Sequence, residues 1–158
     1  MTTLATVALL DRGFTAPTIG KQYISNWFLV TQNQIDAFAE ATGDKQWIHT
    51  CNVEQKDNPF GAPIAHGLLL VSLAINLTRA CGALPQATWV LYGFDKLRFR
   101  APVRSGTRIR CLTIILGLQP LGGRQLMSVR LAIEIEGEKI PAITANCTLM
   151  CVNQNGAL

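Results

Sequence analysis

The sequence predicts an α+β domain in which one curved antiparallel sheet wraps around one long apolar helix. Three observations predict this fold class. Residues 64–82 are apolar almost all round, strand-like stretches follow one another from Thr88 onward, and glycines separate those stretches. The chain has 158 residues, 49% hydrophobic and 15% charged, which suits one domain with a proper core better than two. We therefore treat residues 1–158 as a single domain whose core spans about 20–152.

The first part of the chain predicts an extended segment, a short helix and a loop. Residues 22–30 are rich in aromatic and β-branched residues, which favours a strand. Thr31 or Asn33 can then cap a helix of amphipathic spacing, and Gly43 is a natural stop for it. Residues 44–63 include Asn-Pro-Phe-Gly-Ala-Pro, a composition typical of a loop.

The second part predicts the central helix and the sheet. A helix in residues 64–82 is apolar enough to be buried on most sides, and Gly82 ends it. Sequential strands in one sheet pair mostly in an antiparallel way. A single sheet must bury one face, and the apolar helix is the available partner, which describes the hot-dog architecture. The expected strands are residues 89–94, 96–103, 108–116, 127–137 and 143–152, with turns at Gly106, Gly122–Gly123 and Gly137.

Charge and hydropathy exclude some classes of protein. The net charge of +4 and the pI near 9.0 are mild, and the basic residues are less clustered than in nucleic-acid-binding proteins. A small excess of positive charge suits an anionic small ligand, such as one that carries phosphates. The low fraction of charged residues also indicates that a second subunit covers part of the apolar surface. We expect no membrane span, because the apolar stretches near the N-terminus and at residues 64–77 are shorter than about 20 residues.

Cysteine usage predicts free thiols and no metal site. The five cysteines form an odd count without any CxxC pair, which is typical of buried thiols in a reducing cytoplasm. Cys51, two residues after His49, stands alone, and neither histidine has cysteines at zinc-finger spacing. The cysteines are Cys51, Cys81, Cys111, Cys147 and Cys151.

The segment Gly-Asp-Lys-Gln-Trp-Ile-His-Thr carries the first candidate for chemistry. It places Asp44 five residues before His49, on the loop that follows the predicted helix stop. A carboxylate beside an imidazole orients it and raises its basicity, and the pair can hold a water and move protons in both directions. Taken alone, this spacing is more typical of a turn-capping aspartate and a half-buried histidine. Trp47, between them, is more typical of a packing residue than of a ligand platform.

The segment Gly-Ala-Pro-Ile-Ala-His-Gly-Leu-Leu-Leu carries the second candidate. Gly67 lies at the front of the apolar helix, where first-turn N–H groups have no internal partner and the helix dipole favours negative charge. Such an N–H can hold the oxygen of an enolate or thioester, and a glycine allows close approach. The alternatives are a packing glycine at position 67 and a core or capping histidine at His66.

Together the two segments resemble the MaoC-like dehydratases, a family that includes the (R)-specific enoyl-CoA hydratases. The family signature has an aspartate, an asparagine–proline pair, and a histidine five residues after the aspartate. Asp44 and His49 fall on the acid and the base, and the resemblance extends from about residue 20 to 150. Gln46 and Trp47 replace the asparagine–proline pair, which bears on substrate range. The other stretches that resemble the family are ATGD, PFGAPIAHG and YGFDKLRFRAPVRSGTRIR.

The resemblance implies hydration of a trans-2-enoyl thioester to a (3R)-3-hydroxyacyl thioester, or the reverse dehydration. Asp44 and His49 would share the water and Gly67 N–H would hold the thioester oxygen, with no metal or cofactor. The acyl chain would run beside Leu68 on the helix, and Trp47 is a further candidate for substrate contact. The thioester carrier is CoA or an acyl-carrier protein, and the architecture implies a homodimer. Candidates for binding the CoA phosphates are Lys96, Arg98, Arg100, Arg104 and Arg108, with Arg104 the best single choice.

Several alternatives stay open from the sequence. A hot-dog thioesterase would share the fold, but such enzymes usually rely on a carboxylate near the central helix, and residues 64–82 hold no Asp or Glu. A non-catalytic acyl-thioester-binding domain would not need the Asp44–His49 pair. A nucleic-acid module would show interleaved aromatic and basic residues, which this chain lacks. Ser72 on the helix is a possible supporting residue near the site, and His66 receives no catalytic role.

Overall fold

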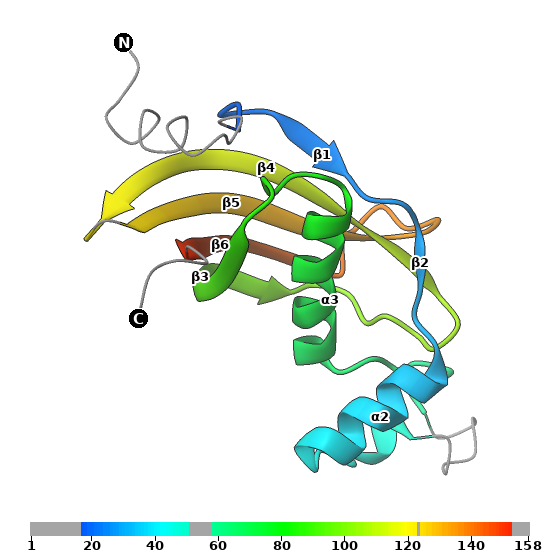
Figure 1. Ribbon diagram of the computed structural model, residues 1–158. Helices are drawn as coiled ribbons and strands as arrows, with labels where there is room; N and C mark the ends of the chain where they lie inside the picture. Colours follow the sequence, from blue (N-terminus) through cyan, green and yellow to red (C-terminus); the bar gives the residue numbers. More distant parts are fainter. Residues whose placement is uncertain (1–16, 51–57, 123, 153–158) are drawn as a thin grey trace.

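The computed structural model describes residues 17–50, 58–122 and 124–152, and its core is a six-stranded antiparallel sheet around helix α3 (Figure 1). The sheet order is β1-β4-β5-β6-β3, and β2 also pairs with β4. Within these residues the predicted fold class is confirmed. The N-terminal apolar stretch, Cys51 and Gly123 lie outside the described residues. The elements are β1 (Gln22–Ile24), β2 (Phe28–Leu29), α2 (Gln32–Thr42), the 3₁₀ turn η1 (Trp47–His49), α3 (Gly67–Ala80), β3 (Thr88–Phe99), β4 (Arg108–Leu121), β5 (Arg124–Ile135) and β6 (Ile143–Val152).

Helix α3 lies against the hollow face of the sheet, in contact with β4 and β5. Its N-terminal end points toward α2, and its sheet-facing side is apolar apart from Thr78. The opposite side is less buried than its sequence predicts, because Leu68, Ser72 and Asn76 are exposed. The helix also begins three residues later than expected. Residues 64–66 stay extended because Ile64 N–H donates to Ile48 and Ala65 N–H donates to Val103. The buried residues of α3 are Leu69, Leu70, Val71, Ala74, Leu77 and Thr78.

The strands follow the alternation that the sequence indicates. Along β5 the side chains of Met127, Val129, Leu131 and Ile133 are buried beneath α3, while their neighbours face the other side of the sheet. Several expected boundaries were wrong. The strands expected at 108–116 and 127–137 run instead over Arg108–Leu121 and Arg124–Ile135. The stretches 89–94 and 96–103 were expected as two strands, yet β3 runs continuously to Phe99, with pairing shifts near Gly93 and before Arg98. Residues 22–30 were expected as one strand but divide into β1 and β2, since residues 25–27 leave the ladder.

Helix α2 ends where the candidate aspartate begins. Of the two expected caps the structure uses Thr31, which forms a reciprocal capping box with Gln34. Gly43 ends the helix with φ +76°, a left-handed conformation that glycine adopts without strain. The cap therefore reverses the chain at Gly43 and directs Asp44 back toward the start of α3. In the described part of the chain no helix is long and apolar enough to cross a bilayer.

Two core thiols predict a loss of stability at high pH. Burial raises the pKa of the Cys147 thiol from 9.0 to about 12, and burial also raises the pKa of Cys111. The unfolded chain releases these protons near pH 9, while the native chain keeps that of Cys147 until about pH 12. The unfolded state therefore binds fewer protons in this window, and the free energy of unfolding falls as pH rises.

Urea titrations between pH 8 and pH 11 measure this effect. The control is Cys147→Val, because other groups also titrate in this range and only the difference between the two proteins belongs to the thiol. We expect the variant to lose less stability than the parent. Equal pH slopes for both proteins would contradict the prediction.

Candidate active site

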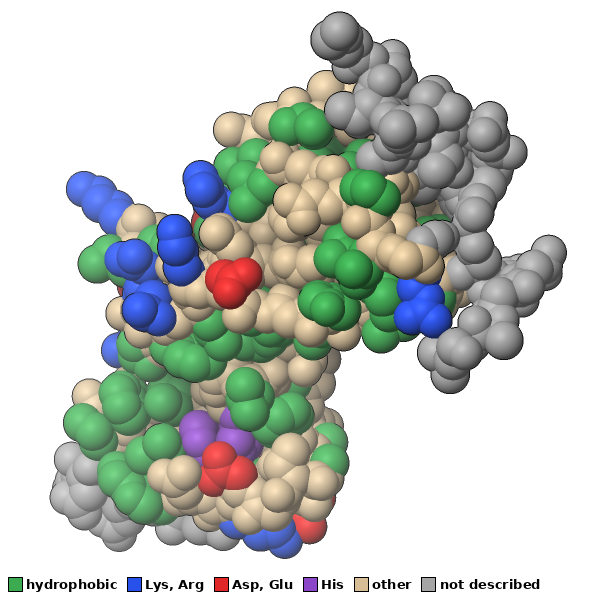
Figure 2. Space-filling view, turned by 90° about the vertical axis from the view of Figure 1, so that its left-hand side faces the viewer, with side chains coloured by type: hydrophobic (Ala, Val, Ile, Leu, Met, Phe, Trp, Pro, Cys, Tyr) green, Lys and Arg blue, Asp and Glu red, His purple; other side chains and the backbone are tan. Residues whose placement is uncertain are grey.

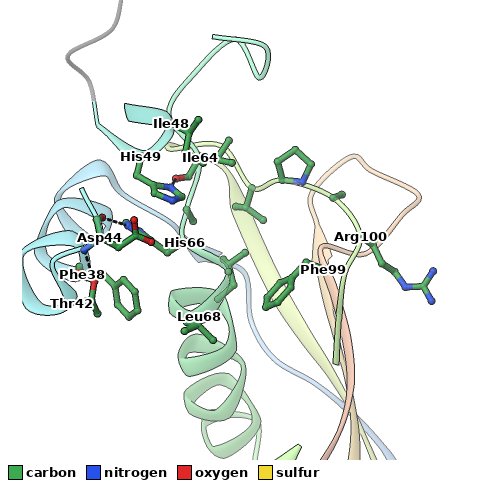
Figure 3. A pocket seen from close by; sticks show the side chains of 16 residues that line it. Phe38, Thr42, Asp44, Ile48, His49, Ile64, His66, Leu68, Phe99 and Arg100 are labelled. Carbon is green, nitrogen blue, oxygen red and sulfur yellow. Dashed lines mark hydrogen bonds between the residues drawn. The ribbon is translucent and has the colours of Figure 1, made fainter. Parts of the chain in front are cut away.

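A pocket of about 600 Å³ opens where α2, the loop after it, the start of α3 and the segment after β3 meet (Figure 3). Its polar side chains gather at one side, and most of the rest of its wall is apolar. In Figure 2 the two histidines lie in a hollow with apolar side chains around it. The lining residues are Phe38, Thr42, Asp44, Ile48, His49, Ile64, Ala65, His66, Gly67, Leu68, Leu70, Phe99, Arg100, Ala101, Pro102 and Val103.

Asp44 lines this pocket with a partly exposed side chain. Its Oδ1 accepts a hydrogen bond from the side-chain amide of Gln46, over 3.1 Å. Gln46 stands where the family signature has asparagine, so an amide donor is still present on this loop. The bond leaves the second carboxylate oxygen of Asp44 available to a ligand or a water.

His49 lies in η1 on the opposite wall and is only 6% exposed. Its Nδ1 lies 2.7 Å from the carbonyl oxygen of Ile64. A carbonyl only accepts, so Nδ1 carries a hydrogen, and in the neutral form of the ring Nε2 is then the acceptor. The side chain of Gln32 donates to the His49 carbonyl over 2.9 Å and anchors this turn to α2. The bond to Ile64 thus fixes the orientation of the His49 ring and directs Nε2 away from Ile64.

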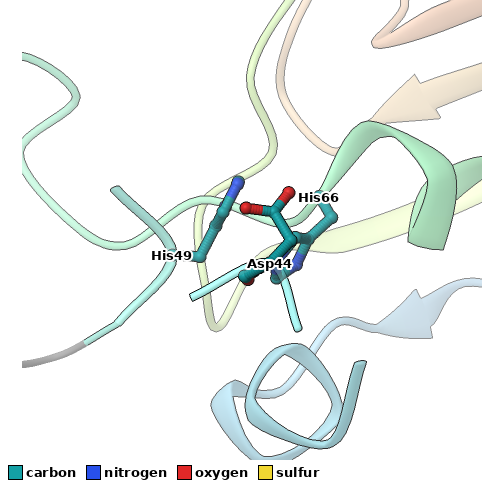
Figure 4. A group of neighbouring side chains, drawn as sticks. All are labelled: Asp44, His49 and His66. Carbon is teal, nitrogen blue, oxygen red and sulfur yellow. The ribbon is translucent and has the colours of Figure 1, made fainter. Parts of the chain in front are cut away.

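The two side chains lie close enough to share one water. Ligand atoms of Asp44, His49 and His66 all lie within 4.8 Å of one another (Figure 4). A water that bonds to two acceptors at about 2.8 Å each bridges a gap of this size. Because the rest of the pocket wall is largely apolar, such a water would be held in a site of low polarity, where its interactions with charge are strong.

The same three residues also form a candidate metal group, but their geometry is poor for one. The rings of His49 and His66 are stacked, with centroids 3.6 Å apart and planes 24° apart. Lone pairs in the planes of two stacked rings run side by side and do not converge on a single point. A bound transition metal needs its imidazole nitrogens to converge at about 2.0–2.1 Å.

Gly67 is the first residue of α3, and the ring of Phe99 lies against it. Its N–H belongs to the first turn, so it has no partner within the helix. A Cβ added at Gly67 would lie 2.7 Å from Cε1 of Phe99, which is too close for either group to stay in place. The glycine therefore allows Phe99 to cover the front of the helix at the pocket wall.

Gly67→Ala is expected to weaken substrate binding without unfolding the protein. Phe99 is exposed, so we expect the new methyl group to displace its ring into the pocket. We expect KM for a short enoyl thioester to rise about tenfold, which is about 1.4 kcal/mol of binding. The matched control is Gly117→Ala, where an added Cβ meets nothing within 4 Å. A KM equal to that of the control variant would contradict this prediction.

The other candidates for substrate contact fall in different places. Leu68 lines the pocket and is 63% exposed, whereas Trp47 and Arg104 are not among the lining residues. The Nε of Arg104 donates to the carbonyl of Phe60 over 2.6 Å, which holds that side chain away from the pocket. Arg100 is the basic candidate among the lining residues, but its Nε donates to Oγ1 of Thr144 over 3.0 Å and its guanidinium extends away from the pocket (Figure 3). Substrate contact by Trp47 and Arg104 stays a prediction.

Sequence reasoning missed part of the site. Ser72, the possible supporting residue, donates to the carbonyl of Leu68 one turn back and is not among the lining residues. The pocket is instead completed by Phe38 from α2 and Phe99 from the end of β3, and by His66 beneath His49. The amphipathic spacing of α2 predicts that Phe38 is a core residue. Nothing in the sequence indicates that it also forms part of the pocket wall.

Comparison with known proteins places the chain in a family. The family model described as a MaoC like domain matches residues 14–135. The chain belongs to the MaoC-like family. That assignment agrees with the resemblance carried by the Asp44–His49 loop and by the segment before α3.

Two curated relatives cover most of this MaoC-like chain. A 3-hydroxyacyl-thioester dehydratase Z of Mycobacterium tuberculosis is 37% identical over 123 residues, which is 77% of this chain and 82% of the relative. Nodulation protein N of Rhizobium leguminosarum bv. viciae is 39% identical over 126 residues, 77% of this chain and 78% of the relative. The chain is about equally similar to the two relatives, so sequence identity alone does not indicate which of them it resembles in function.

Solved structures confirm the hot-dog fold. The R-hydratase of Pseudomonas aeruginosa superimposes with a TM-score of 0.69 at 21% identity, over 87% of this chain and 83% of that one. The (R)-hydratase of A. caviae gives a TM-score of 0.69 at 20% identity, over 84% and 95% of the two chains. At this level of identity the likeness concerns the fold.

Proposed function

We propose that this MaoC-like protein adds water to trans-2-enoyl thioesters to give (3R)-3-hydroxyacyl thioesters, and catalyses the reverse dehydration. Family membership and the dehydratase among the curated relatives support the reaction class. The observation that carries the proposal is the convergence of Asp44 and His49 in one pocket whose remaining wall is largely apolar. Such a site accommodates an acyl chain and one activated water.

The geometry supports a division of labour between the two residues. Nε2 of His49 takes a proton from the shared water as the hydroxide attacks C3 of the enoyl group, while Asp44 accepts the other hydrogen of that water and orients it. The resulting imidazolium then returns a proton to C2, so one water is added and the protein ends unchanged. The scheme uses no metal and no cofactor.

Gly67 would stabilise the charge that develops during this step. As the hydroxide attacks C3, negative charge builds on the thioester oxygen. A first-turn N–H of α3 at the pocket wall is suited to receive that oxygen, and the helix dipole adds to the attraction. Loss of one such donor typically removes about 3 kcal/mol of transition-state stabilisation.

The carrier of the acyl group needs cations at the pocket mouth. Arg100 lines the pocket, and Lys96 and Arg98 are exposed on the same end of β3. Figure 2 shows a group of basic side chains above the hollow on this face. These residues suit the phosphates of CoA, and a phosphopantetheine arm on an acyl-carrier protein offers the same thioester and a phosphate.

We further propose that the protein is a homodimer joined along β3. This strand is at one edge of the sheet, and Val90, Leu91 and Tyr92 on it are exposed. An unpaired apolar edge is a surface on which a second copy can add its own β3. Sedimentation of the purified protein should give twice the monomer mass, and Leu91→Lys should shift it toward monomer. A monomeric parent protein would contradict the proposal.

A cytoplasmic location is also part of this proposal. Three cysteines in the described residues, Cys81, Cys111 and Cys147, are free thiols. Free thiols persist in a reducing compartment. Localisation of a tagged full-length chain tests this directly, and a tag found outside the cytoplasm would contradict it.

The reaction itself is tested with crotonyl-CoA and longer 2-enoyl-CoA thioesters. Hydration removes the absorbance of the conjugated enoyl group and releases no thiol. A thioesterase would instead release free CoA, which a thiol reagent detects, and that result would replace the proposal by the alternative reading. If neither signal appears for any acyl chain, the protein is a binding domain without turnover.

A further inference from the structure

His66 is a buried polar residue that the reaction scheme does not use. It is 3% exposed and forms the N-cap of α3. Its ring lies between two other rings, tilted by 49° against Phe38 of α2 and stacked on His49 of η1 (Figures 3 and 4). One side chain at the start of α3 therefore contacts both of the segments that flank Asp44.

His66 also bonds directly to the backbone of Asp44. Its Nε2 lies 2.9 Å from the Asp44 carbonyl oxygen, and since a carbonyl only accepts, Nε2 carries the hydrogen. This bond joins two residues 22 positions apart in the sequence. It fixes the residue that follows the left-handed cap at Gly43, and with it the direction in which the Asp44 carboxylate leaves the backbone.

The same short stretch of backbone holds His49. The carbonyl of Ile64, two residues before His66, accepts from Nδ1 of His49, and the face of the His66 ring supports the His49 ring at 3.6 Å. The stretch is itself anchored, because Ile64 N–H donates to Ile48 and Ala65 N–H donates to Val103. Asp44 and His49 are thus both held by the same anchored stretch of backbone, residues 64–66.

Packing alone does not account for a histidine here. Nδ1 of His66 is buried and has no hydrogen-bond partner among the described residues. A buried acceptor without a partner is destabilising, and an apolar ring of similar shape would fill the same space without that penalty. What a histidine adds over such a ring is the N–H bond to Asp44.

We propose that His66 is a positioning residue for the reaction, and this inference rests on the proposed function. Its Nε2–H fixes Asp44 and its ring face fixes the plane of His49, so that the Asp44 carboxylate and the His49 ring stay at water-sharing distance. In this proposal His66 acts on the reaction through these two residues.

Three variants of His66 distinguish the effect of its N–H donor from the effect of its ring. His66→Phe keeps an aromatic ring on His49 but removes the donor. His66→Gln keeps an amide N–H at similar reach but removes the ring, and His66→Met removes both and serves if His66→Phe does not fold. We expect His66→Phe to lower kcat for crotonyl-CoA hydration by about 10²-fold, with KM changed less than about threefold, because a displacement near 1 Å has effects of this size. His66→Gln should recover at least about tenfold of that loss.

Several results would overturn the proposal. Wild-type kcat in both donor-free variants would show that the bond has no positioning effect. A rise in KM at constant kcat would make His66 a binding residue. A loss of kcat in His66→Gln equal to that in His66→Met, in proteins of unchanged thermal stability, would show that the donor is not responsible, because both variants lack the ring.

A crystallographic comparison keeps this inference separate from the proposed function. We expect structures of the parent and of His66→Phe to differ in the direction of the Asp44 side chain. If the parent protein proves inactive on every enoyl thioester and Asp44 still turns away in His66→Phe, the proposed reaction fails and the structural coupling stands. If Asp44 keeps its place in His66→Phe, the positioning inference fails whatever the activity.

Discussion

His49→Ala should lower kcat for hydration of crotonyl-CoA by about 10³-fold while the protein stays folded. A correctly placed general base contributes about 10²–10⁴-fold, and His49 lines the pocket with Nδ1 bonded to the Ile64 carbonyl, which leaves Nε2 to act as the base. KM should change little, because the apolar wall that holds the acyl chain is untouched. Steady-state kinetics with matched circular dichroism spectra measure both quantities.

Chemical rescue is the control for this variant. The truncation leaves room for an imidazole molecule beside His66, so added imidazole should restore part of the lost kcat in His49→Ala. The same imidazole should not restore activity in a variant of Asp44, where the missing group is a carboxylate. Activity of His49→Ala within about threefold of the parent would exclude His49 as the base, given the size of the expected effect.

Asp44→Asn should lower kcat by about 10²-fold or more, at almost unchanged shape. An amide at this position still accepts from Gln46, and the Asp44 backbone carbonyl still accepts from His66, so the loop keeps its bonds. What is lost is the negative charge that orients the water and balances the imidazolium as it forms.

The matched control for this variant is Asp95→Asn. Asp95 is an exposed carboxylate on β3, outside the pocket lining, and loses the same charge. Its kinetics should match those of the parent. Equal losses in the two variants would mean that overall charge, and not a carboxylate at the water site, governs the rate.

The sequence predicts those features of the fold that depend on neighbouring residues. The caps at Thr31 and Gly43 and the alternation along β5 depend on neighbouring residues and were confirmed. The continuity of β3 was missed because a β-bulge depends on the partner strand. Lys96 adopts φ +54° there, and a lysine in the sequence does not predict this conformation. The late start of α3 likewise depends on bonds from residues 64–65 to distant segments.

In the site, too, the sequence predicted residues that lie in local motifs and missed contacts between distant segments. Asp44, His49 and Gly67 lie in recognisable segments, and the structure brings all three to one pocket. His66 was left without a role because its bond to Asp44 and its stacking on His49 connect elements far apart in the chain. Arg104 was chosen from its place in a turn, but the carbonyl of Phe60, which binds it, comes from a loop whose path the sequence does not reveal.

The most direct test of the central claim is a crystal structure of Asp44→Asn bound to crotonyl-CoA. We expect a water hydrogen-bonded to both Nε2 of His49 and the side chain at position 44, with its oxygen about 3–3.5 Å from C3. The thioester oxygen should meet the N–H of Gly67. An enoyl group bound elsewhere, or C3 turned away from a pocket in which no water joins positions 44 and 49, would contradict the account.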